Sequence, residues 1–222
     1  MSDEHSESSS DDSKILNIAR ELCNSLGIEA TSLETLSWQE AYGSFPEKDR
    51  RGNYLGRPVT PHFPIFYKSK LIISPVLNGR LQPEEYRPLL ASSLYFEKKL
   101  SRTRNLGMLL RFAPLLAAAS LLIPALFLKF PILQDNIVLF VFIGIFLVAG
   151  AAGVYTAIRL TRTLVLVADV KSSETSGRQS LLNVLEKLES LRQLDERFDE
   201  DWPEYGDHPS IARRMENLKQ ST

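Results

Sequence analysis

The chain has 222 residues and a formal net charge of −1 at neutral pH, so its charge gives no bulk attraction to nucleic acid or to an acidic partner. Its single cysteine, Cys23, excludes an intrachain disulfide and a zinc site built from cysteines. The length alone predicts one domain with appendages.

The N-terminal 26 residues contain a polar segment and then an apolar periodic one. Residues 1–13 are acidic and rich in serine and contain no apolar run of the kind that a secretory signal peptide carries. Their low hydrophobicity predicts a disordered tail. From Lys14 to Leu26, apolar residues recur every three or four positions and Gly27 follows, which predicts an amphipathic helix with a buried Cys23.

The next segments are short and interrupted. Residues 28–38 alternate only in part, which leaves a short strand possible, and residues 41–64 are loop-like because prolines and glycines interrupt them. Ile65–Tyr67 and Lys70–Ser74 are predicted strands joined by a turn at residues 68–69, which makes a β-hairpin.

A helix is predicted from Pro83 to about Leu100. Proline is favourable in the first turn of a helix, and Glu84 and Glu85 suit its positive end.

Two long apolar runs, Phe112–Leu128 and Ile137–Ile158, predict a transmembrane hairpin. As a helix the second run is roughly 30 Å long, the thickness of the hydrocarbon layer. The link over residues 130–136 is too short for anything but a tight turn. A buried helical hairpin in a soluble protein is the alternative.

Cations flank both apolar runs on the side away from the link. They are Lys98, Lys99, Arg102, Arg104, Arg111, Arg159, Arg162 and Lys171. This bias predicts an integral membrane protein with two spans and both termini in the cytoplasm. Anionic lipid headgroups are the expected partners of Lys98, Lys99, Arg102 and Arg104, at about 1 kcal/mol per cation. No nucleic-acid role is expected, because aromatic residues do not interleave with the cations.

Ala149, Gly153 and Ala157 form a stripe of small residues on the second run. The stripe predicts close helix contact, either within the hairpin or with another membrane protein.

Three helical segments are predicted after the second run. Residues 160–170 continue the same helix into the cytoplasm, and residues 172–177 end it. Residues 180–198 are amphipathic and predict a helix that docks on the domain or on a partner. Residues 195–207 are an acidic loop, and residues 209–218 are a short final helix.

Several segments together resemble one enzyme family. They are Lys70–Leu77, Leu81–Phe96, the hairpin 112–158, Val165-Leu166-Val167-Ala168-Asp169, and His208-Pro209-Ser210-Ile211-Ala212-Arg213-Arg214. In this order they resemble the membrane-integrated zinc metallopeptidases of the HtpX and CAAX-prenyl-protease type. The matching family features are the edge strand, the first active-site helix, the paired membrane helices, a Glu-x-x-Ala-Asp segment and a His-Pro-x-x-x-x-Arg element.

The resemblance implies a gluzincin-like helical domain with an inserted two-helix transmembrane hairpin, and the predicted fold is mainly α with a small β-hairpin or sheet. The expected parts are the tail (1–13), a cytoplasmic peptidase-like N-terminal part (14–106), the transmembrane hairpin (107–159) and a cytoplasmic peptidase-like C-terminal part (160–222).

The residues that would carry the family's chemistry are missing. Where His-Glu-x-x-His would stand, the chain has Ser92-Ser93-Leu94-Tyr95-Phe96. The resemblance maps the two histidine ligands to Ser92 and Phe96, the general base to Ser93 and the third ligand to Val165, while Asp169, His208 and Arg214 are retained. Zinc needs nitrogen, oxygen or sulfur ligands at about 2 Å, which phenylalanine and valine lack. We therefore expect no metal, no cofactor and no peptidase activity, with Ser92, Phe96 and Val165 close together.

The resemblance also implies a binding edge. In such peptidases an extended substrate pairs with the edge strand, so Lys70, Leu71, Ile72, Ile73 and Ser74 are expected to accept a strand without cleaving it. The expectation fails if this strand is already paired on both sides.

The predicted function is that of a catalytically inactive, membrane-anchored, metallopeptidase-like protein that acts by binding, as a regulator or scaffold of a protein or membrane complex. One alternative is an accessory structural subunit of a membrane complex. Another is an active membrane metalloendopeptidase, which metal analysis would distinguish. Serine hydrolysis at Ser92 or Ser93 would need a histidine or lysine base within reach.

Overall fold

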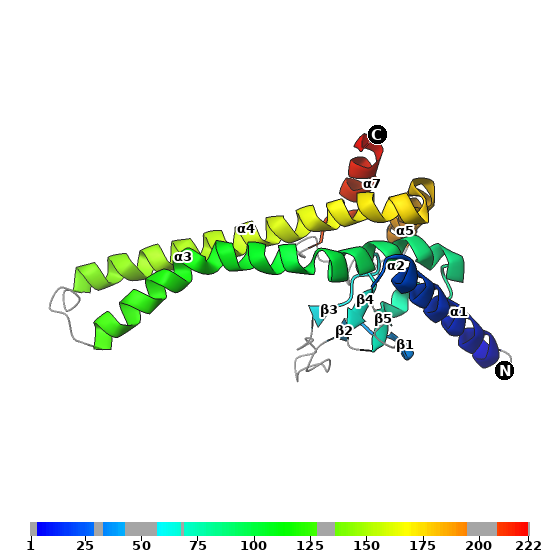
Figure 1. The fold of residues 1–222 in the computed structure, drawn as a ribbon, viewed down its shortest axis with the longest axis horizontal. Helices are drawn as coiled ribbons and strands as arrows, with labels where there is room; N and C mark the ends of the chain where they lie inside the picture. The colour runs from blue at the N-terminus through cyan, green and yellow to red at the C-terminus, as the bar shows by residue number, and fades with distance from the viewer. Residues whose placement is uncertain are drawn as a thin grey trace. The chain divides into compact units, whose positions relative to one another are not determined.

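The computed structural model describes residues 4–28, 33–42, 57–67, 69–127, 136–194 and 208–221. These residues are mainly helical and include a small three-stranded sheet (Figure 1), as predicted. The chain divides into unit 1, which comprises Met1–Leu100 and Val165–Thr222, and unit 2, which comprises Ser101–Leu164.

Helix α1 covers Glu4–Ser25, so the predicted disordered tail is wrong over residues 4–13. The apolar stripe beyond residue 14 does pack into the core as predicted. Once a helix has formed, extending it costs little free energy, because each added residue closes one further hydrogen bond. Two side-chain contacts also hold the polar part. The indole of Trp38 donates to Asp12 at 3.1 Å, and Lys14 pairs with Asp11 at 2.9 Å.

The three-stranded sheet consists of β1 (Thr35–Trp38), β5 (Lys70–Ile73) and β4 (Ile65–Tyr67), in that order. Strands β4 and β5 pair antiparallel, with Ile65 opposite Ile72, which confirms the predicted hairpin. Strand β1 pairs parallel to the other side of β5. The predicted edge strand is therefore the central strand.

A second, two-stranded ladder lies in the segment that was predicted to be a loop. Strands β2 (Ala41–Tyr42) and β3 (Arg57–Pro58) pair antiparallel there. Residues 43–56 lie outside the described part of the chain.

The predicted helix from Pro83 is built of three pieces. A 3-10 turn, η2 (Pro83–Glu85), leads into α2 (Tyr86–Leu94), and a π-helical turn, η3 (Tyr95–Lys99), ends it. Upstream, η1 (Pro75–Leu77) follows the sheet. The Glu85 carboxylate accepts from the Gln82 backbone N–H at 2.7 Å and from Lys187 at 2.7 Å, so it caps η2 and ties this turn to α5 (Arg178–Leu194).

The C-terminal helices follow the predicted order. Helix α4 (Asn136–Ser176) ends where Gly177 takes a φ of 85°, α5 covers Arg178–Leu194, and α7 covers Ile211–Gln220. The predicted acidic loop, residues 195–207, lies outside the described residues. Helix α5 docks on the domain, since one face of it is buried: Leu181, Leu182, Val184, Leu185 and Leu188.

The core of unit 1 gathers apolar residues from α1, the sheet, α2, α5 and α7. Representative members are Ile18 and Leu22, Leu71 and Ile73, Leu89 and Leu94, Leu185 and Leu188, and Ile211 and Leu218. Because α7 contributes to this core, it fixes the position of its buried charged side chain, Arg214.

Unit 2 contains α3 (Ser101–Phe127) and the part of α4 up to Leu164. The two helices pack through glycines: a Cβ on Gly107 would stand 2.6 Å from Leu160 Cδ2, and one on Gly153 would stand 3.0 Å from the Phe112 ring. Gly153, part of the predicted small-residue stripe, therefore receives a side chain of the same hairpin.

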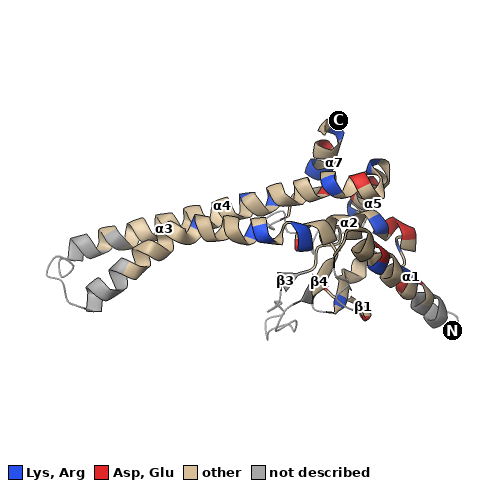
Figure 2. Ribbon diagram, viewed as in Figure 1, with Lys and Arg blue, Asp and Glu red and all other residues tan. Residues whose placement is uncertain are grey.

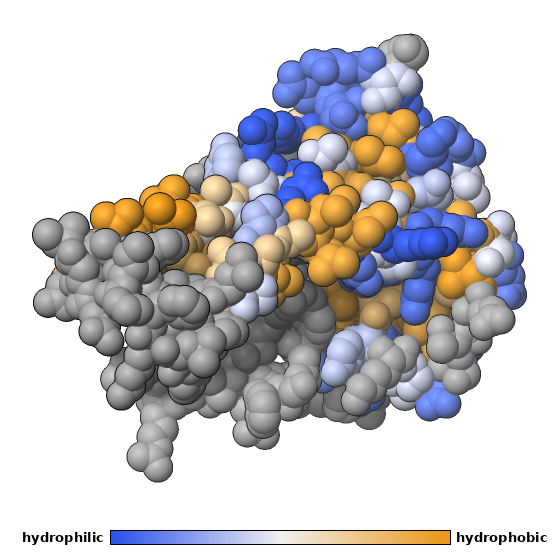
Figure 3. Space-filling model, turned by 60° about the vertical axis from the view of Figure 1, so that its left-hand side comes forward, coloured by the Kyte–Doolittle hydropathy of each residue, from blue (hydrophilic) through white to orange (hydrophobic). Residues whose placement is uncertain are grey.

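Hydrophobic side chains are exposed along both helices of unit 2. Leu106, Leu109 and Leu110 on α3 and Phe140, Leu147 and Val148 on α4 are 55–71% exposed, and hydrophobic surface is visible in the space-filling view (Figure 3). Among the described residues, one helical stretch, Ile143–Ser176, is long and apolar enough to cross a membrane by length and composition.

Candidate functional site

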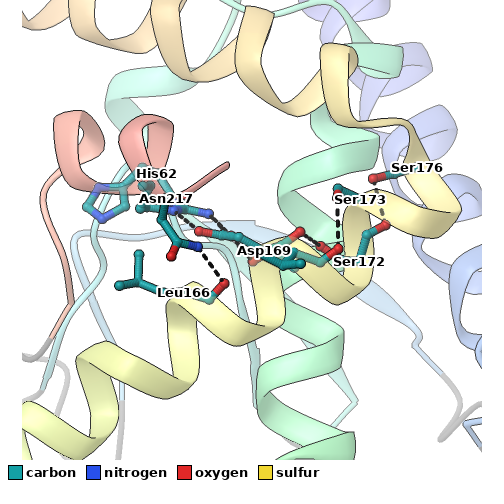
Figure 4. A network of polar contacts seen from close by, with 10 residues as sticks. His62, Leu166, Asp169, Ser172, Ser173, Ser176 and Asn217 are labelled. Atoms are coloured by element: carbon teal, nitrogen blue, oxygen red, sulfur yellow. Dashed lines mark hydrogen bonds and ion pairs between the residues drawn. The ribbon is translucent and has the colours of Figure 1, made fainter. Parts of the chain in front are cut away.

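Arg214 and Asp169 form an ion pair that is completely buried in unit 1. Neither side chain is exposed to solvent. Arg214 donates from Nε to Asp169 Oδ2 at 2.8 Å and from Nη2 to Oδ1 at 2.6 Å. Such a two-pronged contact is the strongest geometry for a guanidinium and a carboxylate. Figure 4 shows the contacts around Asp169.

Two neighbours satisfy the remaining hydrogen-bonding groups of the pair. The Ser92 hydroxyl, from α2, donates to Asp169 Oδ1 at 2.6 Å. Arg214 Nη1 donates to the backbone carbonyl of His62 at 2.8 Å. Both residues are buried. The network thus joins α2, α4, α7 and the loop before β4, and it compensates two charges that burial would otherwise strongly penalise.

Contacts at both ends of α7 hold Arg214 in place. The Ser210 hydroxyl caps the helix by accepting from the Arg213 backbone N–H. Further along, Asn217 Nδ2 donates to the Leu166 carbonyl of α4 at 3.3 Å, as Figure 4 shows, and Arg178 of α5 donates to the Leu218 carbonyl. Helix α7 is therefore fixed to both neighbouring helices, which leaves the guanidinium little freedom.

An aromatic cluster covers the network on one side. The Phe63 ring lies 4.5 Å from the His208 ring and 5.4 Å from the Phe96 ring, measured between centroids. The His62 ring lies 6.3 Å from the His208 ring. The Arg214 guanidinium stands 5.9 Å over the Phe63 ring, close enough for a cation–π contact.

The predicted site residues divide into those that meet and those that do not. Ser92, Asp169 and Arg214 are in direct contact, and Phe96 and His208 meet in the aromatic cluster. Val165 is fully buried one helical turn before Asp169. Its direct contact with Phe96 stays a prediction.

Ser92 and Ser93 are adjacent and equally buried, yet their hydroxyls differ. Within the described part of the chain, Ser93 Oγ has no hydrogen-bond partner. We expect Ser92→Ala to lower the free energy of unfolding by about 1.5–3 kcal/mol, the usual value of a hydrogen bond to a charged group. Ser93→Ala removes an unsatisfied buried hydroxyl, so it is expected to be neutral or stabilising by about 1 kcal/mol.

Urea unfolding of the full chain in a mild detergent measures both effects. The fluorescence of Trp38 reports on unit 1 if Trp202 is replaced by phenylalanine in every variant. Equal destabilisation by the two alanines would contradict the assigned difference between the hydroxyls.

His62 is buried uncharged. Burial lowers its pKa well below the usual value, and Coulombic interactions with Arg214 and then His208 lower it further, while a hydrogen bond with the Pro209 backbone raises it. A second positive charge beside the guanidinium is thus disfavoured at neutral pH.

Acidification is therefore expected to destabilise unit 1. In the unfolded chain the His62 imidazole takes up its proton near pH 6.5, whereas the folded state resists protonation. The free energy of unfolding has its full value above about pH 6.5. Below that pH it falls by up to about 1.4 kcal/mol per pH unit, because the unfolded state binds more protons than the folded state. Urea midpoints between pH 7.5 and 5.5 measure this slope, and His62→Leu should flatten it. An unchanged slope in His62→Leu would show that another group titrates.

The predicted binding edge is wrong. Strand β5, with Lys70, Leu71, Ile72 and Ile73, is paired with β4 on one side and β1 on the other. Ser74 follows the strand and is buried. The backbone groups of β5 that a substrate strand would need are already used.

Sequence analysis did not identify His62 and Phe63 as residues of the site. His62 lies in the loop before β4 and supplies a carbonyl to Arg214, and Phe63 packs on the guanidinium. They stand between Pro61 and Pro64 in a segment without periodicity, so no pattern indicated their burial. The one available signal was composition, since an aromatic residue between prolines is suited to packing.

The polar groups of the site are engaged with one another within the buried network. Among the described residues, no group of three or more His, Cys, Asp or Glu side chains is placed to hold a metal ion. The Ser92 hydroxyl donates to a carboxylate that Arg214 already neutralises. The same hydroxyl lies 3.5 Å from Arg214 Nη2, so both charged groups of the pair contact it.

No family model, no curated protein and no solved structure matches the chain. The resemblance to zinc metallopeptidases stays a prediction.

Proposed function

We propose that the chain is a catalytically inactive, membrane-anchored, metallopeptidase-like protein that acts by binding, as a regulator or scaffold of a protein or membrane complex. The observation that carries this proposal is the ion pair of Arg214 and Asp169 with Ser92. Ser92 stands where the resemblance places the first histidine ligand, and its hydroxyl is hydrogen-bonded to Asp169. The charge of Asp169 is balanced by Arg214 of the same chain.

The buried position of Phe96 supports the same proposal. Phe96 is 3% exposed and packs edge-on against Phe63, so an apolar ring fills the position proposed to correspond to the second histidine ligand. In this proposal the former metal pocket has become part of the core, with a guanidinium and aromatic rings in place of a cation and its ligands.

A second candidate function is that of an accessory structural subunit. The pairing of β5 on both sides favours it, because the strand that was expected to receive a peptide has no free edge. In this second proposal the hairpin, and not the cytoplasmic domain, makes the functional contacts.

Metal analysis of the purified full chain tests the absence of catalysis. We expect far less than one zinc per chain after purification without chelator. Stoichiometric zinc that is lost in Phe96→Ala or His208→Ala would overturn the proposal.

A hairpin exchange separates the two candidates. The variant replaces residues 107–159 with an unrelated two-span hairpin, and quantitative mass spectrometry follows the proteins that co-purify in mild detergent. A partner retained by the exchanged chain supports binding by the cytoplasmic domain. A partner lost by it supports the accessory subunit.

We also propose two membrane spans with both termini in the cytoplasm. Cys23 is the single cysteine, so a Cys23→Ala chain allows introduced cysteines to be labelled one at a time. An impermeant maleimide added outside intact cells should label Gln134→Cys in the link and leave Leu194→Cys unlabelled. Leu194 is 83% exposed, so its protection would come from the membrane and not from burial. The reverse pattern would contradict the proposed orientation.

A further inference from the structure

Two guanidinium groups meet at one helical turn of α4, from Tyr155 to Arg159. The Arg159 guanidinium lies 5.8 Å from the centre of the Tyr155 ring. Arg111 of α3 reaches the same turn, since its Nε donates to the Thr156 carbonyl at 3.1 Å and its Nη1 donates to the Gly107 carbonyl at 2.9 Å. Both contacts hold the guanidiniums in place without neutralising them, because neither a carbonyl nor an aromatic ring carries a negative charge.

Among the described residues of unit 2, no carboxylate balances these charges. The described residues of unit 2 include five arginines and no aspartate or glutamate: Arg102, Arg104, Arg111, Arg159 and Arg162. In Figure 2 the basic positions of unit 2 gather toward one end of its two helices. Two neighbouring cations without an anion favour an anionic ligand.

The packing of the hairpin places the two arginines within about one helical turn of each other along its axis. Gly107 faces Leu160 and Phe112 faces Gly153, so the antiparallel helices are in a fixed register. In this register Arg159 lies level with about residue 108 of α3, roughly 5 Å along the axis from Arg111. Exposed leucines occupy the same levels, since Leu106, Leu109 and Leu110 are 55–64% exposed.

A cationic pair among exposed apolar side chains matches the chemistry of a lipid headgroup. The leucines suit acyl chains, and a guanidinium binds a phosphate through parallel hydrogen bonds. The ligand should carry a net negative charge. A choline or ethanolamine group would need a carboxylate or a free aromatic face, and the described part of unit 2 has no acid while Arg159 covers the Tyr155 ring.

We propose that Arg111 and Arg159 form a binding site for the phosphate of an anionic phospholipid. The inference rests on the proposed membrane integration, and it goes beyond a general attraction between cations and the membrane surface because it assigns one pair of residues. Arg111 also ties the two helices together, so Arg159, which is exposed, is the better residue to change.

Native mass spectrometry of the full chain tests the site. The protein is incubated in detergent with equal amounts of dioleoyl phosphatidylglycerol and dioleoyl phosphatidylcholine, and the bound lipids are counted. We expect wild-type protein to retain phosphatidylglycerol selectively and Arg159→Gln to bind it about tenfold more weakly, the effect of losing one charge-assisted contact.

Lys171→Gln is the matched control. It removes the same charge from the chain, but Lys171 already pairs with Glu174 at 3.1 Å, so its charge is balanced. We expect less than about a twofold loss from it. Equal losses in Lys171→Gln and Arg159→Gln would overturn the site and leave only diffuse attraction. Displacement of the lipid by excess glycerol phosphate would also overturn it, since the ligand would then be a free phosphate.

Extraction of membranes with alkaline carbonate separates this inference from the proposal on which it rests. A chain that is extracted is not integral, and both ideas fail. A chain that stays in the membrane but shows no selectivity for phosphatidylglycerol overturns the lipid site alone.

Discussion

Asp169→Asn is expected to lower the free energy of unfolding by about 3–5 kcal/mol, the usual cost of removing one partner of a buried ion pair. The asparagine keeps the size of the side chain but leaves the Arg214 guanidinium without a counter-charge in a site with no solvent exposure. It also replaces one carboxylate oxygen, which accepts a hydrogen bond from Arg214, with an amide NH2 group, which can only donate. Urea unfolding of the full chain in detergent, followed by Trp38 fluorescence with Trp202 replaced by phenylalanine, measures the loss.

Glu174→Gln is a matched control on the same helix. Glu174 pairs with Lys171 at 3.1 Å, but both side chains are more than half exposed, so we expect less than about 1 kcal/mol from its loss. Similar effects of the two substitutions would contradict the assignment of Asp169 to a dry, buried pair.

Replacing both charges tests whether the pair serves stability or binding. A double variant, Asp169→Leu with Arg214→Met, removes the two charges together, so it should recover most of the stability that either single change loses. If the folded double variant still binds the partners of the wild-type chain, the pair has a structural role. Loss of those partners would assign the network to the binding function.

The helices of this chain could be predicted because their apolar residues repeat every three or four positions. The ends were less predictable than the centres. Helix α1 begins at Glu4 and not at Lys14. The part of the helix that packs on the core acts as a nucleus, and the helix extends from it into the polar residues that precede it. Helix α4 continues to Ser176, late in the predicted break over residues 172–177, because it ends where Gly177 takes a positive φ. These differences arise from tertiary contacts and glycine conformation, which periodicity does not report.

The order of the sheet could not be predicted from the same patterns. The β4–β5 hairpin is local, and its turn residues identified it. Strand β1 pairs with β5 across an intervening segment rich in proline and glycine, and its own alternation is weak. The central position of β5 therefore depends on a long-range pairing without a sequence signal, and the expected free edge was wrong for that reason.

The residues of the site were easier to name than their contacts. Ser92, Asp169 and Arg214 were singled out by resemblance, but they lie 45 to 122 positions apart, and nothing in the sequence indicated that they form one network. His62 takes part through its backbone carbonyl, which any residue could supply. Side-chain identity therefore pointed to the charged pair, but it could not point to the His62 backbone carbonyl that completes the network.

Phe96→Ala is expected to lower the free energy of unfolding by about 3–5 kcal/mol, as for other buried aromatic residues cut back to alanine. The ring is 3% exposed, lies 5.4 Å from Phe63 and 6.3 Å from His208, and its loss would leave a cavity beside the buried network. Leu194→Ala is the control, since Leu194 is 83% exposed and its truncation should change stability by less than about 0.5 kcal/mol.

Phe96→His separates packing from polarity at the same position. The imidazole fills much of the volume of the phenyl ring, so less of the loss comes from a cavity, but it buries a polar ring among aromatic side chains at a cost of about 1–3 kcal/mol. We expect the histidine variant to be more stable than the alanine variant and less stable than the wild type. If Phe96→Ala were instead as stable as the wild type, the ring would not be filling a closed pocket, and the proposal that apolar packing has replaced a metal site would lose its support.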